Sequence, residues 1–331
     1  MSRNIMSNYS QKHIMQLSII TINYNNAEGL RKTLASVAAQ SYANIQHVII
    51  DGNSSDTSKD VIIDYAENTK NPNHEILWVS EKDKGIYNAM NKGIEIALCK
   101  RVVNEDHTSS PIALSPHRLI ASDYIQILNS GDILAASDVT ERMMAALASY
   151  SEQSERSTGE AELQQSDLPT ILYGNMIKVN AQDKVVGKSG YTEYSLRQFY
   201  HSTLNHDCAY IRKDLFEEYG LYDENLKIVS DWKWYLEAIG LGRVKPEYVD
   251  IDVTIFDDGG ISETQLDKRY AERRKVLEEV MPPAVLWDYD THAFEMEQMN
   301  RLRRWKLYPL VYFMERVCFK FEKWFNKLKR L

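Results

Sequence analysis

Cysteine is scarce in this sequence. Its three cysteines lie far apart and form no Cys-x-x-Cys pair, which argues against a disulfide framework or a zinc knuckle and favours a reducing compartment. No stretch of about 18 apolar residues is present to span a membrane, and residues 1–16 lack the apolar core of a signal peptide. We therefore expect a cytoplasmic protein.

Glycine-rich phosphate loops are also missing, because neither G-x-x-x-x-G-K-[S/T] nor G-x-G-x-x-G occurs. The net charge of −8 argues against a nucleic-acid partner. This charge is distributed unevenly, since residues 301–331 carry +8 and the remainder carries −16. The last segment is therefore expected to have a different solvent or partner from the rest of the chain.

Strand-like and helix-like segments alternate through the first half. The spacing of apolar residues predicts strands at 16–25, 45–52, 74–81 and 124–128, and helices at 27–40, 54–68 and 85–100. Such alternation is typical of an α/β fold with a mainly parallel sheet flanked by helices. Polar stretches at 101–122 and 151–169 lack a clear period, and we interpret them as mobile surface insertions.

The second half, from about residue 170, is less regular. The segments "ILYGNMIKVN" and "KVVGKSGYT" are typical of a hairpin, and helices are predicted near 212–219 and 231–239. We expect an α+β region that forms a second wall of a site. The predicted organisation is thus a tail at 1–15, one domain at 16–280 with halves at about 16–135 and 170–280, and a helical extension at 281–331.

Polar side chains follow each early strand. Carboxyl ends of parallel strands share one edge of a sheet, where ligands bind in open α/β folds. Carboxylates there can accept hydrogen bonds from a ribose or a base, and a divalent cation can neutralise a diphosphate without a glycine-rich loop. The side chains at the four strand ends are Thr21, Asn23 and Asn25; Asp51, Asn53, Ser54 and Ser55; Glu81, Asp83 and Lys84; and Asn129, Ser130 and Asp132.

Within this set, Asp132 is the candidate ligand of the cation. The alternative to a ligand site at Asn129–Asp132 is an ordinary β-turn, because Asn, Ser, Gly and Asp each favour turns.

At this point the sequence resembles a known family. The segments "SIITINYNNAEGLRKTLASVAAQSY", "VIIDGNSSDTSKDVI", "SEKDKGIYNAMNKGI" and "LNSGDIL", in this order, resemble the family 2 glycosyltransferases of bacterial polysaccharide assembly. The resemblance covers about residues 16–135 and extends more weakly through "YIRKDLFEEYGLYDENLKIVSDWKWYLEA". It implies the Rossmann-like GT-A fold, inversion at the anomeric carbon, a nucleotide-sugar donor and a divalent cation (Mn²⁺ or Mg²⁺) held by an acidic DXD-type motif.

The resemblance also implies roles for individual residues. Asp132 matches the last acid of the DXD-type motif, which binds the metal, although Gly131 replaces the usual preceding Asp. Asp231, in "LKIVSDWKWYL", matches the general base; taken alone, it reads as a helix N-cap. The residues expected beside the nucleotide or donor sugar are Thr21, Asn23, Asn25, Asp51, Asn53, Asp83, Lys84, Gly85, Asn91, Asn129, Ser130 and Gly131.

Three further features have two interpretations each. His206 precedes a predicted strand and is either structural or a contact of the donor phosphates or the acceptor. The segment "DDGGIS", at 257–262, is either a capping loop or part of active-site closure. The aromatic residues of "DWKWY" belong to the core, or one of them stacks on a sugar.

The carboxyl-terminal segment has an apolar stripe and a basic face. The stripe (Leu310, Met314, Val317, Phe321, Trp324, Leu328) recurs every three to four residues, as in an amphipathic helix. It can pack on the domain, on another subunit or in a membrane surface. Eight aromatic and ten basic residues within 301–331 favour an anionic membrane, which predicts a peripheral protein on the inner face of the cytoplasmic membrane.

Together these features predict an inverting, metal-dependent glycosyltransferase of the cell envelope. The expected donor is a UDP-sugar that supplies a hexose or N-acetylhexosamine, and the expected acceptor is a lipid-linked saccharide of a surface polysaccharide. A nucleotidyltransferase is the alternative enzyme, although "TINYNNAEG" is not its glycine-rich loop. A non-catalytic saccharide-binding scaffold is the other alternative, and Gly131 is the feature that favours it.

Overall fold

The computed structural model describes residues 14–69, 74–111, 122–158, 168–180, 182, 184–257 and 265–328. The chain divides into a first unit that ends at Arg274 and a second unit at 275–331. The three cysteines are free, as the sequence predicts.

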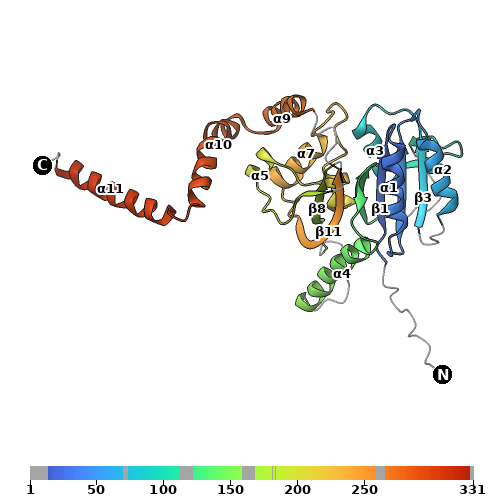
Figure 1. Cartoon of the computed structure of the whole chain (residues 1–331), viewed down its shortest axis with the longest axis horizontal. Coiled ribbons are helices and arrows are strands. Elements are labelled where there is room, and N and C mark those ends of the chain that lie inside the picture. Colours follow the sequence, from blue (N-terminus) through green and yellow to red (C-terminus); the bar gives the residue numbers. More distant parts are fainter. Residues whose placement is uncertain are drawn as a thin grey trace, which may run out of the picture. The chain divides into compact units, whose positions relative to one another are not determined.

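The first half of the chain forms the predicted βαβ units (Figure 1). Its strands are parallel and lie in the order β3-β2-β1-β6. The elements are β1 (Leu17–Asn23), α1 (Ala27–Ala38), β2 (Ile45–Asp51), α2 (Ser58–Asn68), β3 (His74–Ser80), α3 (Ile86–Ala97) and β6 (Tyr124–Asn129).

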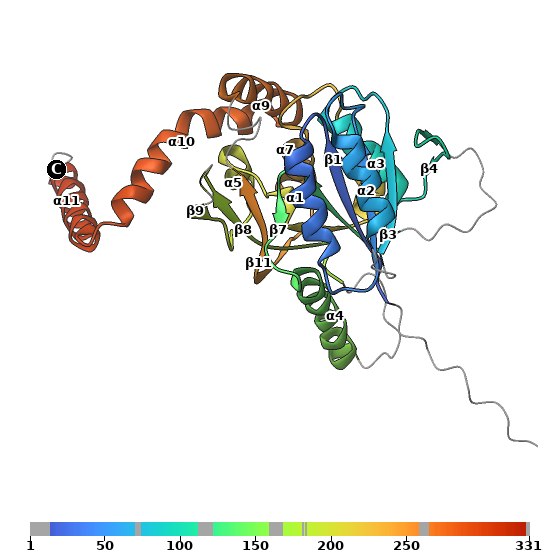
Figure 2. The ribbon, with the colours of Figure 1, turned by 45° about the vertical axis from the view of Figure 1, so that its right-hand side comes forward.

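Helices cover both faces of these strands. On one face α1 and α2 lie side by side (Figures 1 and 2), where Leu34 and Ile62 pack with Ile49 of β2. On the other face α3 comes close to β1, because a Cβ added at Gly93 would meet Ile20 at 2.4 Å. The strands are therefore buried on both faces, as continuous apolar runs require.

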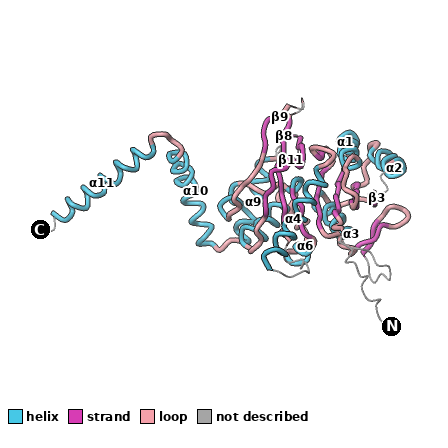
Figure 3. Tube along the Cα trace, turned by 90° about the horizontal axis from the view of Figure 1, so that it is seen from below, coloured by secondary structure: helices cyan, strands magenta, loops and turns pink. Residues whose placement is uncertain are grey.

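The second half continues the same sheet with mixed strand directions. β10 is antiparallel to β6 and β8, and β11 is parallel to β8 but antiparallel to β7. Strands thus run through the unit with helices on either side (Figure 3). The elements are β7 (Ile133–Leu134), α4 (Val139–Thr158), β8 (Ile171–Val179), β9 (Val185–Lys188), α5 (Leu196–His201), η2 (His206–Cys208), β10 (Ala209–Arg212), α6 (Asp214–Glu218), α7 (Ser230–Tyr235), the π-helix η3 (Leu236–Leu241) and β11 (Glu247–Asp257).

Several details of the predicted secondary structure can be compared with the observed elements. The hairpin of β8 and β9 is confirmed, and the aromatic side chains of α7 lie in the core. Both polar insertions contain regular structure that the period did not reveal: a hairpin of β4 (Arg101–Val103) with β5 (Ser109–Pro111), and the last turns of α4 up to Thr158. Residues 258–262 of the Gly-Gly-Ile-Ser segment lie outside the described residues.

The carboxyl-terminal part is helical. α9 (Leu266–Val280) crosses the boundary between the units, and α10 (Pro283–Arg303) and α11 (Tyr308–Leu328) follow in the second unit. In α11 many apolar side chains of the predicted stripe are exposed, among them Leu310, Phe321 and Trp324. Among the described residues, no helix is both long and apolar enough to cross a membrane.

Candidate active site

The polar ends of the first strands meet at one edge of the sheet. Asn23 of β1 lies opposite Asp51 of β2, Asp51 lies opposite Ser80 of β3, and Ile22 of β1 lies opposite Asn129 of β6. The convergence expected from parallel strands is therefore present. What this edge binds stays a prediction.

Asp51 organises this edge from a fully buried position. Its carboxylate accepts hydrogen bonds from Asn23 Nδ2 (2.9 Å), from the backbone N (3.0 Å) and Oγ (2.5 Å) of Ser54, and from Ser80 Oγ (2.9 Å). The loops that it holds expose Asn25 and Asn53, which adopt positive φ angles of 49° and 60°. Asp51 thus fixes the loops that present these two amides, whatever else it contacts.

Two residues predicted beside the nucleotide are turned away from it. Thr21 is fully buried, and its Oγ1 is 2.9 Å from Nε2 of His47 in the layer between the sheet and the helices. The buried amide of Asn91 donates to Tyr222 O and Glu224 Oε1 and accepts from Tyr222 N. Neither side chain is available to a ligand, because each is buried and bound to other residues. The sequence could not show this, since local strand and helix patterns do not reveal which partners a polar side chain will find.

The segment after β3 does reach the edge. Gly85 N donates to Asp83 Oδ1 (2.9 Å), and Gly85 has a φ of +127° that favours glycine. The other carboxylate oxygen of Asp83 lies where a Cβ on Gly52 would be, so glycine at 52 allows this approach to the loop after β2. Lys84 is exposed beside them.

The tetrapeptide Asn129–Asp132 is tied to α1. Thr33 Oγ1 donates to Asp132 O (2.8 Å) and accepts from Gly131 N (2.9 Å), and Asn26 Nδ2 donates to Ser130 O (2.9 Å). Gly131 has a φ of +115°. The turn interpretation is therefore right about the backbone, and the turn places the Asp132 side chain against a cavity.

Asp231 lies at the centre of a polar cluster. It belongs to the first turn of α7, whose N-cap is Val229, so its carboxylate does not occupy the N-cap position. Tyr87 OH of α3 donates to Oδ1 (2.7 Å), and His206 Nδ1 is 3.3 Å from Oδ2. The other ring nitrogen of His206 is 3.1 Å from the amide of Asn129. The cluster therefore joins α3, α7, η2 and the end of β6.

Charge is shared within this cluster. Burial would lower the pKa of His206, but the hydrogen bond and charge of Asp231, together with the charges of Asp207 and Asp132, raise it to about 9. Burial would raise the pKa of Asp231, but His206 and the Tyr87 hydroxyl hold it below its ordinary value. At neutral pH the cluster thus contains an imidazolium and a carboxylate.

A cavity of about 160 Å³ adjoins the cluster. Asp132, His206 and Asp231 line it together, so these three predicted residues lie around one space. Its remaining lining comes from β8, β11, η2, α7, α9 and the loops before η2 and α7, and consists of Met176, Lys178, Thr203, Asn205, Asp207, Ile228, Val229, Trp232, Phe256, Arg269 and Arg273.

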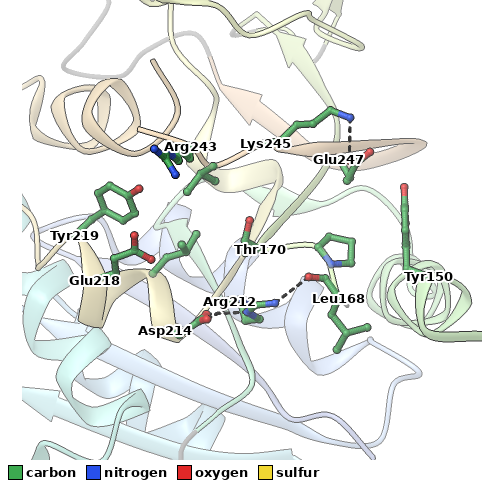
Figure 4. Close-up of a pocket in the computed structure, with 13 residues that line it drawn as sticks. Tyr150, Leu168, Thr170, Arg212, Asp214, Glu218, Tyr219, Arg243, Lys245 and Glu247 are labelled. Atoms are coloured by element: carbon green, nitrogen blue, oxygen red, sulfur yellow. Dashed lines mark hydrogen bonds and ion pairs between the residues drawn. The ribbon is translucent and has the colours of Figure 1, made fainter. Parts of the chain in front are cut away.

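A larger cavity of about 420 Å³ lies near the opposite ends of these strands (Figure 4). Four of its charged side chains form two ion pairs: Arg212 with Asp214 (2.7 Å) and Lys245 with Glu247 (3.5 Å). Arg212 also donates to Leu168 O. This cavity contains none of the predicted site residues.

The residues present fit a cation that brings most of its own ligands. In the described ranges, no group of three or more His, Cys, Asp or Glu side chains forms a ready-made metal site. Three carboxylates line the cavity: Asp231 is engaged by Tyr87 and His206, Asp207 accepts from Thr254, and Asp132 is the one that we expect to meet the cation. Mg²⁺ and similar ions are often held by one or two carboxylates plus substrate phosphates and water, so Asp132 suits that mode of binding.

Sequence reasoning missed three residues of this site. Tyr87 holds Asp231, and Arg269 and Arg273 line the cavity. Asp207, which precedes the same predicted strand as His206, accepts a hydrogen bond from Thr254 Oγ1 (2.6 Å) beside the cavity. The two arginines, four residues apart in "LDKRYAERRKVL", share one helix face. Their spacing of four residues was the feature of the sequence from which this pair could have been predicted.

Comparisons with known proteins agree with this architecture. The family described as "Glycosyl transferase family 2" matches residues 18–107. The "PGL/p-HBAD biosynthesis glycosyltransferase" of Mycobacterium bovis (strain BCG / Pasteur 1173P2) is 22% identical over 257 residues, which cover 77% of this chain and 82% of the relative. An uncharacterized glycosyltransferase of Mycobacterium tuberculosis (strain CDC 1551 / Oshkosh) is 28% identical over 226 residues, 67% of this chain and 68% of the relative.

The fold is also known from solved structures. S. aureus TarS 1-349 matches with a TM-score of 0.52 at 15% identity, over 81% of this chain and 66% of that one, just under two thirds of its length. The fold is the GT-A fold of glycosyltransferases. Residues 18–107 thus match a family 2 glycosyltransferase domain, and the glycosyltransferase relatives together with the shared fold support a glycosyltransferase enzyme.

Proposed function

We propose that this enzyme transfers a sugar from a nucleoside diphosphate sugar to a hydroxyl of a saccharide acceptor, with inversion at the anomeric carbon. Solved complexes of TarS 1-349 contain UDP and UDP-GlcNAc. This supports a UDP-sugar as donor, with a hexose or N-acetylhexosamine as the transferred group. The edge formed by Asn23, Asn25, Asn53, Asp83 and Lys84 is where we place the nucleotide.

The carboxylate of Asp231 carries this proposal. Inversion requires a base that takes the proton of the acceptor hydroxyl while its oxygen attacks opposite the leaving nucleotide. Asp231 is ionised, oriented by Tyr87 and His206, and lines the cavity shared with Asp132. An acceptor hydroxyl in that cavity would reach the Asp231 carboxylate.

Asp132 is the residue that we expect to hold a divalent cation together with the donor diphosphate. When bound, such an ion would stabilise negative charge on the leaving diphosphate. His206, kept positive by its neighbours, would add to this stabilisation from the cavity that it lines together with the two carboxylates.

The test is transfer from UDP-sugars combined with calorimetric titration of UDP, with and without Mn²⁺. We expect Asp231→Asn to lower transfer at least about 100-fold, as loss of a general base does, while UDP still binds. Asp132→Asn should lose metal-dependent UDP binding.

Asp138→Asn, at an exposed carboxylate near the start of α4, is the matched control. Full transfer by Asp231→Asn would refute the mechanism. Absence of UDP and GDP binding to the native protein would favour the scaffold alternative.

We place the enzyme on the inner face of the cytoplasmic membrane, where a lipid-linked acceptor of a surface glycan would be found. The relative named for PGL/p-HBAD biosynthesis supports a lipid-associated acceptor. α11 supports the membrane partner, because its aromatic residues are exposed and Arg316 and Lys323 lie against the rings of Tyr312 and Phe319. Such helices bind anionic surfaces through both apolar area and charge.

A further inference from the structure

Two arginines of α9 line the cavity that contains Asp231. Arg269 and Arg273 are four residues apart and are partly buried, whereas Lys268 and Arg274 of the same helix are exposed. Like charges at this spacing repel one another, and the charge of Arg269 contributes to lowering the pKa of Arg273, after burial. This part of α9 therefore holds two cations close together.

Arg273 is held in a fixed orientation. Its guanidinium lies 4.8 Å from the centre of the Trp232 ring, and Nη1 donates to His201 O at 3.2 Å. Its Nε is buried without a hydrogen-bond partner among the described residues, and no described carboxylate forms an ion pair with Arg273. A partly buried cation whose buried Nε has an unused donor favours an anionic ligand.

The position of these arginines indicates which substrate carries that anion. Apart from Asp132, the cavity lining comes from the second half of the chain. Arg273 lies close enough to Asp231 to interact with its charge, and Asp231 is the base that must meet the acceptor hydroxyl. The base and ribose of the donor, in contrast, are placed on the edge formed by β1, β2 and β3, and only its diphosphate is placed at the cavity, on Asp132.

We infer that Arg269 and Arg273 bind an anionic group, a phosphate or a carboxylate, that the acceptor carries close to its reacting hydroxyl. The inference rests on the proposed function, because it assigns the acceptor class of the same site. A guanidinium suits both groups, since its N–H pairs match two oxygens at once. The acceptor is thus an acidic or phosphate-bearing saccharide rather than a neutral one.

Calorimetric titration tests this with the full chain, in the presence and absence of UDP and Mn²⁺. The probes are glucose 1-phosphate, methyl glucuronide and the neutral methyl glucoside. We expect at least one charged probe to bind about tenfold or more tightly than methyl glucoside. The stronger of the two charged probes identifies whether phosphate or carboxylate is the source of the anion.

Variants assign this preference to the two arginines. Arg269→Gln and Arg273→Gln should each abolish the preference for the charged probe and leave UDP affinity unchanged. Lys268→Gln, which removes one exposed charge from the same helix, should retain the preference, and thermal unfolding checks that every variant is folded.

Equal binding of charged and neutral probes would overturn the inference, as would absence of binding by all three. Loss of UDP affinity in the arginine variants would also overturn it, because the arginines would then belong to the donor diphosphate. Failure of UDP to bind the native protein would instead count against the proposed function, and the saccharide titrations without UDP would still decide the inference.

Discussion

Gly131 is the residue on which the turn before Asp132 depends. Its φ of +115° lies in a region that side chains rarely adopt, and such a conformation costs about 1–3 kcal/mol. We expect Gly131→Ala to lower the free energy of unfolding by about that amount and to weaken UDP–Mn²⁺ binding, as measured by urea unfolding and calorimetry. Gly187→Ala is the control, because its new Cβ would be 3.9 Å from the nearest atom at an ordinary φ. Equal effects of both changes would contradict this.

His206 gives the site a pH dependence. Its pKa in the folded protein is about 9, above the ordinary 6.5. Its pair with Asp231 therefore contributes fully to stability below pH 6.5, and this contribution is lost as the pH rises through about 9. The stability difference between the native protein and His206→Gln should be largest near pH 6 and small at pH 9.5. Urea unfolding at both pH values measures it.

His201→Gln, at an exposed histidine on α5, provides the reference for this experiment. It removes an imidazole that does not line the cavity. A difference for His206→Gln that stays constant between the two pH values would mean that the pair does not involve a charged imidazole.

At the scale of elements, local pattern predicted the first half well. The alternating segments fixed β1, α1, β2, α2, β3, α3 and β6 to within a few residues, because each βαβ unit is built from residues close in sequence. The antiparallel pairing of β10 with β6 and β8, and of β7 with β11, was not predictable in this way. Those contacts join segments that are distant in sequence, whereas the spacing of apolar residues indicates only which side of a single segment is buried.

The prediction of the site had the same limit as the prediction of the fold: local motifs were identified, but partners distant in sequence were not. Asp51 and Asp132 were named from the polar strand ends and Asp231 from the family resemblance. The structure places Asp51 at the shared strand edge, and Asp132 and Asp231 line one cavity. Thr21 was expected beside the nucleotide, but its side chain is buried and lies against His47. Strand alternation puts it on the same face as its core neighbour Ile19, but identifying its partner His47 required knowledge of the neighbouring strand and helix.

A buried chain of hydrogen bonds links β1, β2 and α2 through these residues. Thr21 Oγ1 is 2.9 Å from His47 Nε2, and His47 Nδ1 is 2.7 Å from Tyr65 OH. Thr21→Val would leave the ring without one partner, so we expect a loss of about 1–3 kcal/mol in the free energy of unfolding. UDP affinity should not change.

Thr21→Ser keeps the hydroxyl and isolates this bond. It should lose less stability than Thr21→Val, and calorimetry with UDP should again show no effect. A large drop in UDP affinity for either variant would restore Thr21 to the nucleotide site.

At the scale of the whole molecule, charge is separated along the sequence. Residues 301–331 carry +8 while the rest carries −16, and the apolar side chains of α11 are exposed. A basic helix with this composition should bind anionic vesicles, with each lysine near the surface contributing about 1 kcal/mol. Lys320→Gln combined with Lys323→Gln should therefore weaken binding about 30-fold, as measured by flotation with increasing amounts of lipid.

The apolar face and the net charge are tested separately. Phe321→Ser combined with Trp324→Ser should weaken binding to both anionic and zwitterionic vesicles, because it removes buried area rather than charge. Lys32→Gln combined with Lys59→Gln removes the same net charge from exposed sites on α1 and α2 and should leave flotation unchanged. Flotation that is indifferent to all three changes would assign the stripe of α11 to another subunit, and sedimentation of the full chain would then show self-association that the Phe321 and Trp324 changes abolish.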